Sequence, residues 1–244
     1  MHIDVLTLFP EMFGGVLSAS ILGRAIDNGL LSVETHDIRA WAANKHHRVD
    51  DYAFGGGTGL VMMPQPIFDA MRAVDPEHRA RRIYLSPQGR PLDDAKVRSL
   101  AECENLVLLC GHYEGVDQRV IDTLIDEEIS IGDYVLTGGE LPAMVLIDAV
   151  SRQIDGVLGN EMGADEESFA EGLLEYPQYT RPAEYEGLCV PDVLLSGHHA
   201  NILQWRREKM LEKTFAVRPD LLDSAPLSEK ERRLIETWKK NAAK

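Results

Sequence analysis

Short apolar runs alternate with longer amphipathic stretches along the first 158 residues. The apolar runs have the length of buried strands and lie at 2–8, 31–37, 82–85, 105–110 and 128–131. The amphipathic stretches predict helices at 10–28, 66–74, 93–101, 117–126 and 141–154. Strands that alternate with helices predict an α/β fold, in which a parallel sheet is covered by helices on both faces.

The pattern changes twice between these elements. Residues 40–64 are polar and rich in glycine, which predicts a long functional loop. Further loops begin near Ser86, Gly111 and Gly132, each directly after an expected strand. Because the C-terminal ends of parallel strands meet at one edge of a sheet, these three loops are expected to form a ligand site together.

A second domain is expected at the C-terminal end. Residues 159–172 lack apolar periodicity and are acidic, so we expect a flexible linker between a domain at 1–158 and a domain at 173–244. The second domain reads as irregular at 175–191 and then mainly helical, with a helix at 199–215. A last helix is expected to begin at Ser228, because Glu231 three residues later completes a capping box.

Composition limits the class of protein. The 244 residues suffice for one large and one small domain, and the sequence contains neither a stretch that would span a bilayer nor a secretory leader. Cys103, Cys110 and Cys189 are odd in number and widely spaced, which predicts reduced thiols in a cytoplasmic protein. Cys110 ends an apolar run and is expected to be a buried structural thiol.

The negative net charge of the chain disfavours binding to nucleic acid. Forty acidic against 25 basic side chains give a formal net charge of −15. The local field can differ from the net charge, and basic clusters occur at 45–48, 79–82, 206–209 and 232–233. If the chain binds RNA, we expect a small basic footprint on an acidic body and a strong salt dependence.

The segment SIGDYVLTGGELPAM (130–144) carries the most specific signal. It runs from a strand through a glycine-bearing loop into a helix, and Pro142 suits the first helical turn because its missing N–H would have no partner there. Gly132, Gly138 and Gly139 allow sharp turns and a close approach of backbone to a ligand. An ordinary strand–loop–helix connection would be the alternative.

This segment resembles, almost letter for letter, the cofactor loop of bacterial tRNA (guanine-N1)-methyltransferases of the TrmD type, members of the SPOUT superfamily. Six further strings occur in the family's order: LFPEMF (8–13), DDYAFGGG (50–57), YLSPQGR (84–90), CGHYEG (110–115), YTRP (179–182) and LSGHH (195–199). The resemblance implies methyl transfer from S-adenosylmethionine to N1 of the guanosine 3′ of the anticodon. It also implies a C-terminal trefoil knot in the first domain and a homodimer with the active site at the subunit interface.

The resemblance implies that three segments form the S-adenosylmethionine pocket: Tyr84 to Pro87, Gly111 to Glu114 and Ile131 to Leu136. The start of the helix expected at 141–154 also contributes to it. Backbone groups and an apolar slot suit a neutral adenine, and Glu114 suits the ribose or the cationic end. The implied cofactor residues are Tyr84, Leu85, Ser86, Pro87, Gly111, Tyr113, Glu114, Ile131, Gly132, Asp133, Tyr134, Val135, Leu136, Gly138, Gly139 and Pro142.

The implied reaction needs a base for the N1 proton of guanine and a donor for the charge that shifts to O6. The family's functional arginine corresponds to Arg152. Its catalytic aspartate precedes Ser-Phe-Ala, a position that holds Glu167 here, and Asp165 or Glu166 carries the same group nearby. The implied tRNA-binding residues are His46, Arg48, Gly55, Gly56, Gly57, Gly59, Ser196 and His198. Within the glycine-rich segment, Thr58 and Leu60 differ from the residues that are usual in the family.

No metal site is expected. The pairs His46-His47 and His198-His199 lack a third ligand at suitable spacing, although the resemblance makes a use of Mg²⁺ possible. Three other functions stay open: methylation of a ribose 2′-hydroxyl, nucleotide-dependent oxidoreduction or hydrolysis, and RNA binding without catalysis. The chain lacks both G-x-G-x-x-G and G-x-x-x-x-G-K-[ST], which disfavours the nucleotide enzymes.

Overall fold

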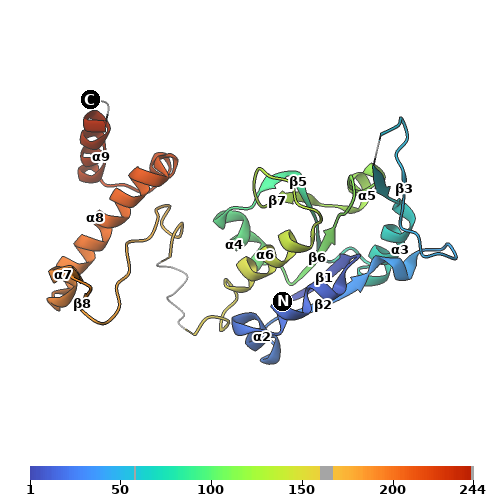
Figure 1. Cartoon of the computed structure of the whole chain (residues 1–244), viewed down its shortest axis with the longest axis horizontal. Helices are drawn as coiled ribbons and strands as arrows, with labels where there is room; N and C mark the ends of the chain where they lie inside the picture. The colour runs from blue at the N-terminus through green and yellow to red at the C-terminus, as the bar shows by residue number, and fades with distance from the viewer. Residues whose placement is uncertain (58, 160–166, 243–244) are drawn as a thin grey trace. The chain divides into compact units, whose positions relative to one another are not determined.

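The computed structural model describes residues 1–57, 59–159 and 167–242 (Figure 1). The chain divides into two compact units, Met1–Glu161 and Met162–Lys244. Each unit has its own buried core and is described separately. Of the linker expected at 159–172, residues 160–166 lie outside the described part.

The first unit is built on a five-stranded sheet. Its strands are β1 (His2–Thr7), β2 (Ser32–Asp37), β5 (Arg81–Pro91), β6 (Asn105–Cys110) and β7 (Glu127–Ser130). They are ordered β2-β1-β6-β5-β7, and each neighbouring pair is parallel. The parallel sheet predicted from the alternating pattern is confirmed, and the apolar runs of β1 and β6 fill its centre.

Helices cover both faces of this sheet, as predicted. Residues of α2 (Ser20–Asp27), α4 (Asp94–Ala101) and α6 (Glu140–Ser151) pack into one buried cluster with alternate residues of β1 and β6. Residues of α3 (Pro64–Val74) and α5 (Gln118–Leu124) pack into a second cluster on the opposite face. Side chains of successive strand residues point to opposite faces, so each central strand contributes to both clusters.

The single helix predicted at 10–28 is wrong. The segment forms a 3₁₀ turn η1 (Pro10–Met12), a short α1 (Gly14–Leu17) and then α2. Ala19 has extended backbone angles and Ser20 has a φ of 53°, so the helical hydrogen-bond ladder cannot continue through them. The apolar spacing continues across this break, which is why the pattern reads as one helix.

The loop predicted at 40–64 contains regular structure. After the 3₁₀ turn η2 (Ile38–Trp41), strands β3 (Asp50–Tyr52) and β4 (Leu60–Met62) form an antiparallel hairpin. Strand β5 also extends to Pro91, beyond the predicted end, with an irregularity between Leu85 and Arg90 in its pairing to β7. The predicted loop near Ser86 is therefore an irregular part of β5, which pairs with the edge strand β7.

The second unit is mainly helical. Its helices are α7 (Asp192–Leu195), α8 (His199–Val217) and α9 (Glu229–Ala242), with a 3₁₀ turn η3 (Pro219–Asp223). They enclose a small core that contains Leu173, Leu211, Leu222, Ala225 and Ile235.

Two local features of the second unit bear on the sequence predictions. The stretch expected to be irregular contains a short hairpin of β8 (Glu184–Tyr185) and β9 (Leu188–Cys189). The capping box is confirmed, because the N–H of Ser228 donates to Glu231 Oε2 at 2.6 Å and the N–H of Glu231 donates to Ser228 Oγ at 3.4 Å. These paired bonds fix the start of α9.

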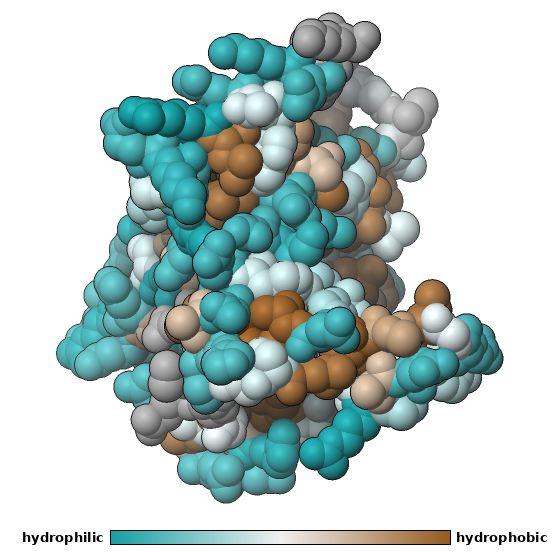
Figure 2. All heavy atoms as spheres, turned by 90° about the vertical axis from the view of Figure 1, so that its left-hand side faces the viewer, coloured by the Kyte–Doolittle hydropathy of each residue, from teal (hydrophilic) through white to brown (hydrophobic). Residues whose placement is uncertain are grey.

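The face of the molecule shown in Figure 2 is mostly hydrophilic and is interrupted by apolar areas. Within residues 1–57, 59–159 and 167–242, no helix has both the length and the apolar character that crossing a membrane requires.

Candidate active site

The irregular part of β5, at residues 84–88, and the loops that follow β6 and β7 line a cavity of about 200 Å³. Except for Asp133, all predicted cofactor residues line it, and they are Tyr84, Leu85, Ser86, Pro87, Gly111, Tyr113, Glu114, Ile131, Gly132, Tyr134, Val135, Leu136, Gly138, Gly139 and Pro142. The cavity wall also includes His112, within the predicted segment Gly111 to Glu114, and five residues outside the predicted segments, namely Gln88, Gly115, Ile129, Ser130 and Thr137. These five residues lie within two positions of a predicted segment, so they could have been predicted from their place in the sequence.

Gly138 and Gly139 bring the start of α6 against the end of β6. The N–H of Gly139 donates to the carbonyl of Gly111 at 2.9 Å, and Gly138 forms a bridge with His112. A Cβ atom on Gly139 would lie 2.7 Å from Cα of Cys110, too close for any side chain. These glycines therefore serve the packing of one backbone on another, in addition to leaving the cavity open.

Gly132 holds a tight turn in the cavity wall. Its φ of 152° lies in the region that favours glycine, and the hydroxyl of Ser130 bonds to both its N–H and its carbonyl. The N–H of Tyr134 donates to the same carbonyl at 2.9 Å, and a Cβ on Gly132 would meet the Tyr134 ring at 2.5 Å. The turn places the Tyr134 ring at the mouth of the cavity, where it is half exposed.

A buried carboxylate anchors the loop that precedes α6. Glu140, in the first turn of this helix, is 2% exposed and accepts a hydrogen bond of 2.8 Å from the hydroxyl of Thr7 at the end of β1. The positive end of the helix dipole favours a negative charge at this position. Sequence interpretation missed Glu140, because its partner lies 133 residues away.

Burial controls the ionisation of two groups beside the cavity. Burial raises the pKa of the Tyr84 phenol to about 12, and the nearby charge of Glu128 acts in the same direction. Burial also raises the pKa of the Cys110 thiol well above its ordinary value, with a further contribution from Glu140. Both groups are neutral at physiological pH. Cys110 is fully buried, as predicted, and Tyr84 can donate a hydrogen bond at the cavity wall.

The glycine-rich segment after β3 meets the loop after β6. The N–H of Glu114 donates to the carbonyl of Leu60 at 3.0 Å, and the N–H of Met62 donates to the carbonyl of Gly115 at 2.9 Å. A Cβ on Gly59 would lie 2.0 Å from Cγ of Glu114. The structure thus brings a residue predicted to bind tRNA against a residue predicted to bind the cofactor.

The other predicted tRNA-binding residues of the first unit are exposed. Gly55, Gly56 and Gly57 have φ values of 87°, 89° and 135°, which side chains disfavour. The N–H groups of His46 and Arg48 both donate to Asn44 Oδ1, which orders the turn before β3. Thr58, whose departure from the family pattern was noted, lies outside the described residues.

In the second unit, Ser196 and His198 lie in the exposed turn before α8, where the N–H of His198 donates to Ser196 Oγ at 3.2 Å. Arg207 of the basic cluster at 206–209 pairs with Glu231 at 2.7 Å and with Glu171 at 2.9 Å. In the first unit, Arg82 of the cluster at 79–82 is buried and bonded to Asp75, so it does not contribute to a basic surface. A buried charge is unfavourable unless it is paired, and Asp75 supplies the partner that allows Arg82 to be buried although its neighbours in the cluster are surface arginines.

The two predicted catalytic residues belong to different units. Arg152 follows the last residue of α6, half-buried, and its N–H donates to the carbonyl of Asp148 at 3.3 Å. Glu167 is the first described residue of the second unit and is half-buried, in a turn closed by the N–H of Ala170. The alternative bases Asp165 and Glu166 lie outside the described residues.

Comparison with known proteins agrees with this arrangement. A family model described as tRNA (Guanine-1)-methyltransferase TrmD matches residues 1–224. Proteins named tRNA (guanine-N(1)-)-methyltransferase are similar over 98% of both chains: the one from Staphylococcus haemolyticus is 56% identical, that from Staphylococcus carnosus 53%, and that from Staphylococcus aureus strain MRSA252 53%. The chain therefore belongs to the TrmD family of tRNA (guanine-1)-methyltransferases, which implies the SPOUT fold.

Proposed function

We propose that this protein transfers a methyl group from S-adenosylmethionine to N1 of the guanosine 3′ of the anticodon in tRNA. The observation that carries the proposal is the cavity formed by residues 84–88 of β5 and by the loops at the C-terminal ends of β6 and β7, in a chain that belongs to this family. Ligands of parallel α/β sheets bind at such an edge.

The cavity residues fit S-adenosylmethionine. Apolar side chains of Leu85, Ile131 and Leu136 suit the faces of an adenine ring, and the surrounding backbone groups suit its polar edge. Glu114 brings a carboxylate that suits the ribose hydroxyls or the cationic end. When bound, S-adenosylmethionine supplies an electrophilic methyl group on a sulfonium.

The reacting nitrogen of guanine carries a proton at neutral pH. We assign the removal of this proton to the Glu167 carboxylate, and the stabilisation of the charge that develops on O6 to the Arg152 guanidinium. Asp165 and Glu166 carry the same functional group as Glu167, and the family register favours Glu167.

For the RNA, we propose contact with the exposed turn at 44–48, the glycines at 55–59 and the turn at 196–198. These segments combine basic or glycine residues with exposed backbone, which suits phosphate and sugar contacts. Since the net charge is −15, binding is expected to weaken steeply as salt is raised. Magnesium would act, if it is used, with the RNA or the cofactor, and we assign it no protein ligands.

A homodimer with the active site at the subunit interface is part of the proposal. Helix α6 is apolar around most of its circumference, which is typical of a helix buried on all sides. In the single chain, however, Leu141 and Val145 of this helix are 50% and 47% exposed. They are four residues apart and lie beside each other on one face, next to the candidate active site. A second copy of the chain would bury this face.

We also propose that the chain threads through itself as a trefoil knot in the first unit. Strand β7 lies at the sheet edge beside β5, yet Gly138 and Gly139 return to the end of β6 on the other side of β5. This return supports a passage of the chain across or through the connection that follows β5.

An unmodified tRNA transcript tests the activity. The purified protein is incubated with the transcript and S-adenosylmethionine, with and without Mg²⁺, and the digested nucleosides are analysed by mass spectrometry. We expect 1-methylguanosine, and none from a transcript with adenosine at that position. Formation of 2′-O-methylguanosine would instead favour ribose methylation. Binding of S-adenosylmethionine without any product would favour an RNA-binding protein without catalysis.

A further inference from the structure

Two histidines and two carboxylates gather on one face of β1 and β2, away from the cavity described above. Asp4 of β1 is in register with Glu34 of β2, and side chains two residues apart along a strand share a face. His2 therefore lies beside Asp4, and His36 lies beside Glu34. None of these residues lines the candidate active site.

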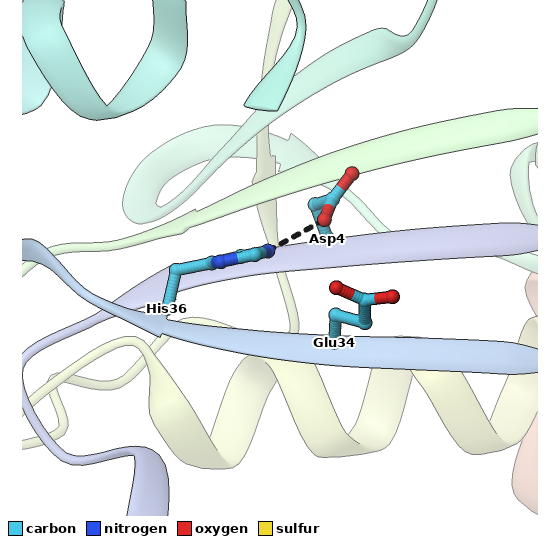
Figure 3. A group of neighbouring side chains, drawn as sticks. All are labelled: Asp4, Glu34 and His36. Atoms are coloured by element: carbon cyan, nitrogen blue, oxygen red, sulfur yellow. Dashed lines mark hydrogen bonds and ion pairs between the residues drawn. The ribbon is translucent and has the colours of Figure 1, made fainter. Parts of the chain in front are cut away.

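The side chains converge, as Figure 3 shows for Asp4, Glu34 and His36. Nε2 of His36 lies 2.6 Å from Oδ1 of Asp4, and one ligand atom from each of the three residues lies within 4.8 Å of the other two. Nε2 of His2 lies 3.1 Å from the second oxygen, Oδ2, of Asp4. The two imidazoles thus bind opposite oxygens of one carboxylate.

The charge of this cluster is not neutralised by a permanent cation. Asp4 is only 8% exposed, and its ion-pair partners are the two histidines. Among the residues that the structure describes, no lysine or arginine pairs with Asp4 or with Glu34. A buried carboxylate next to a second carboxylate is unfavourable unless a positive charge lies between them.

We propose that Asp4, Glu34 and His36 bind a divalent first-row transition-metal ion of the Zn²⁺ class. One imidazole nitrogen and two carboxylate oxygens are ligands that such ions accept, and a three-residue set leaves a position for water. In a tetrahedral site the ligand atoms lie about 3.4 Å apart. The ligand atoms now lie within 4.8 Å of one another, and the exposed side chain of Glu34 would turn toward Asp4 to reach this spacing.

The imidazole distinguishes this site from one for magnesium. Mg²⁺ prefers oxygen ligands in octahedral geometry, whereas Zn²⁺, Co²⁺ and Ni²⁺ bind imidazole well. Nε2 of His36 must carry no proton when it binds the ion, so the ion takes the place of the hydrogen bond between His36 Nε2 and Asp4 Oδ1. The site is independent of any magnesium used in methyl transfer.

His2 acts as a positioning residue in this proposal. Its bond to Oδ2 directs Oδ1 of Asp4 toward His36, as partners of metal-binding carboxylates commonly do. A groove of about 270 Å³ lined by His2, Asp4 and Asn105 gives solvent access to this side of the carboxylate. The ion would join the edge strand β2 to its neighbour β1 and so stabilise the sheet edge.

Competition with a chromophoric chelator tests the proposal on the full-length protein after its metals have been removed. We expect a single Zn²⁺ site per chain that also binds Co²⁺, gives a visible absorption spectrum, and is not competed for by millimolar Mg²⁺. Glu34→Gln and His36→Gln should each weaken Zn²⁺ binding at least tenfold. His2→Gln should weaken it by about 10- to 100-fold while the Co²⁺ spectrum keeps its band positions. Zn²⁺ should raise the melting temperature of the wild type and not that of Glu34→Gln.

Two matched variants complete the test. His78 pairs with Asp126 at 3.1 Å outside the cluster, and Glu77 is an exposed carboxylate near the same groove. His78→Gln and Glu77→Gln should leave the Zn²⁺ affinity unchanged, and melting curves in the presence of a chelator show whether each variant folds. If Zn²⁺ binds folded Glu34→Gln and His36→Gln as tightly as the wild type, or binds none of these proteins, the proposal is wrong. Equal competition by Mg²⁺ would overturn the assignment of the metal class.

Discussion

A Cβ atom on Gly59 would lie 2.0 Å from Cγ of Glu114, so the glycine-rich segment and the cavity loop leave no room for a side chain between them. Two backbone hydrogen bonds, from the N–H of Glu114 to the carbonyl of Leu60 and from the N–H of Met62 to the carbonyl of Gly115, fix the spacing of the two segments. The position of the Glu114 carboxylate in the cavity wall therefore depends on the absence of a side chain at residue 59.

Gly59→Ala is expected to displace the Glu114 side chain and to weaken S-adenosylmethionine binding about as much as Glu114→Ala does. Because Glu114→Ala removes Cγ, the clash disappears in the double variant, and Gly59→Ala should then have no further effect. Calorimetric titration of the four proteins measures this. Additive losses in the double variant would show that Gly59 acts independently of Glu114.

The relation between Gly59 and Glu114 illustrates what the sequence alone could not supply. Apolar runs such as 105–110 predict buried parallel strands, and parallel strands bring their C-terminal loops together, so the cavity followed from the pattern. The hairpin of β3 and β4 within 40–64 could not be predicted in this way. Asp51 and Tyr52 are exposed strand residues, and their pairing depends on β4 and on the loop after β6. Such strands carry no apolar alternation.

Buried polar partners explain two other differences. The burial of Glu140 depends on Thr7 and that of Arg82 depends on Asp75, while a local reading treats both as surface charges. The break before Ser20 is set by backbone conformation that apolar spacing does not report. The resemblance identified the candidate residues, and the structure supplied their packing.

Gly132→Ala is expected to weaken S-adenosylmethionine binding about tenfold or more, equivalent to about 1.4 kcal/mol. Its Cβ would meet the Tyr134 ring at 2.5 Å and disturb the turn that Ser130 holds. Gly156→Ala is the matched control, because Gly156 also has a positive φ, 82°, but lies outside the cavity. Isothermal titration that finds the same affinity for both variants would mean that the Gly132 turn does not shape the pocket.

The buried pair of Arg82 and Asp75 is expected to be important for stability. Nε of Arg82 lies 2.8 Å from Oδ2 of Asp75 with both side chains 7% exposed, and removing one partner of such a pair costs about 3–5 kcal/mol. Arg82→Ala should therefore lower the denaturation midpoint markedly. Arg119→Ala, which removes the exposed partner of Asp117, should not, and similar midpoints for the two variants would contradict the assignment.

The Arg82–Asp75 pair is expected to make the free energy of unfolding depend on pH. Burial opposes the ionisation of Asp75, but hydrogen bonds from the Arg79 N–H and from Arg82 outweigh it and hold the pKa of Asp75 below its ordinary value. The stabilisation is present above the unfolded-state pKa, near 4, and is lost as pH falls through the lower folded-state pKa. Urea unfolding of wild type and Arg82→Ala from pH 7 to pH 2 should show converging free energies of unfolding only at the acid end.

Arg152 and Glu167 are expected to meet across two subunits. Each belongs to a different compact unit of the chain, and the apolar face of Leu141 and Val145 offers a surface for a second copy. Arg152→Ala and Glu167→Ala chains should each be inactive, whereas mixed dimers should regain about a quarter to a half of the wild-type activity, with one intact site. Mixed dimers that form and stay inactive would place both groups of one site in the same chain.

Glu167→Gln is expected to slow single-turnover methyl transfer by about 10²–10⁴, the usual effect of losing a general base. The amide keeps the size and polarity of the side chain, so the affinity for S-adenosylmethionine should be nearly unchanged. Glu167→Asp should stay active, because it restores the residue usual in the family. Raising the pH should partly rescue Glu167→Gln, since the N1 proton of guanine becomes easier to remove. Asp165→Asn and Glu166→Gln are the matched controls in the neighbouring positions. If either of them abolishes transfer while Glu167→Gln is near normal, the base is the neighbour, and the family register does not hold at this position of the chain.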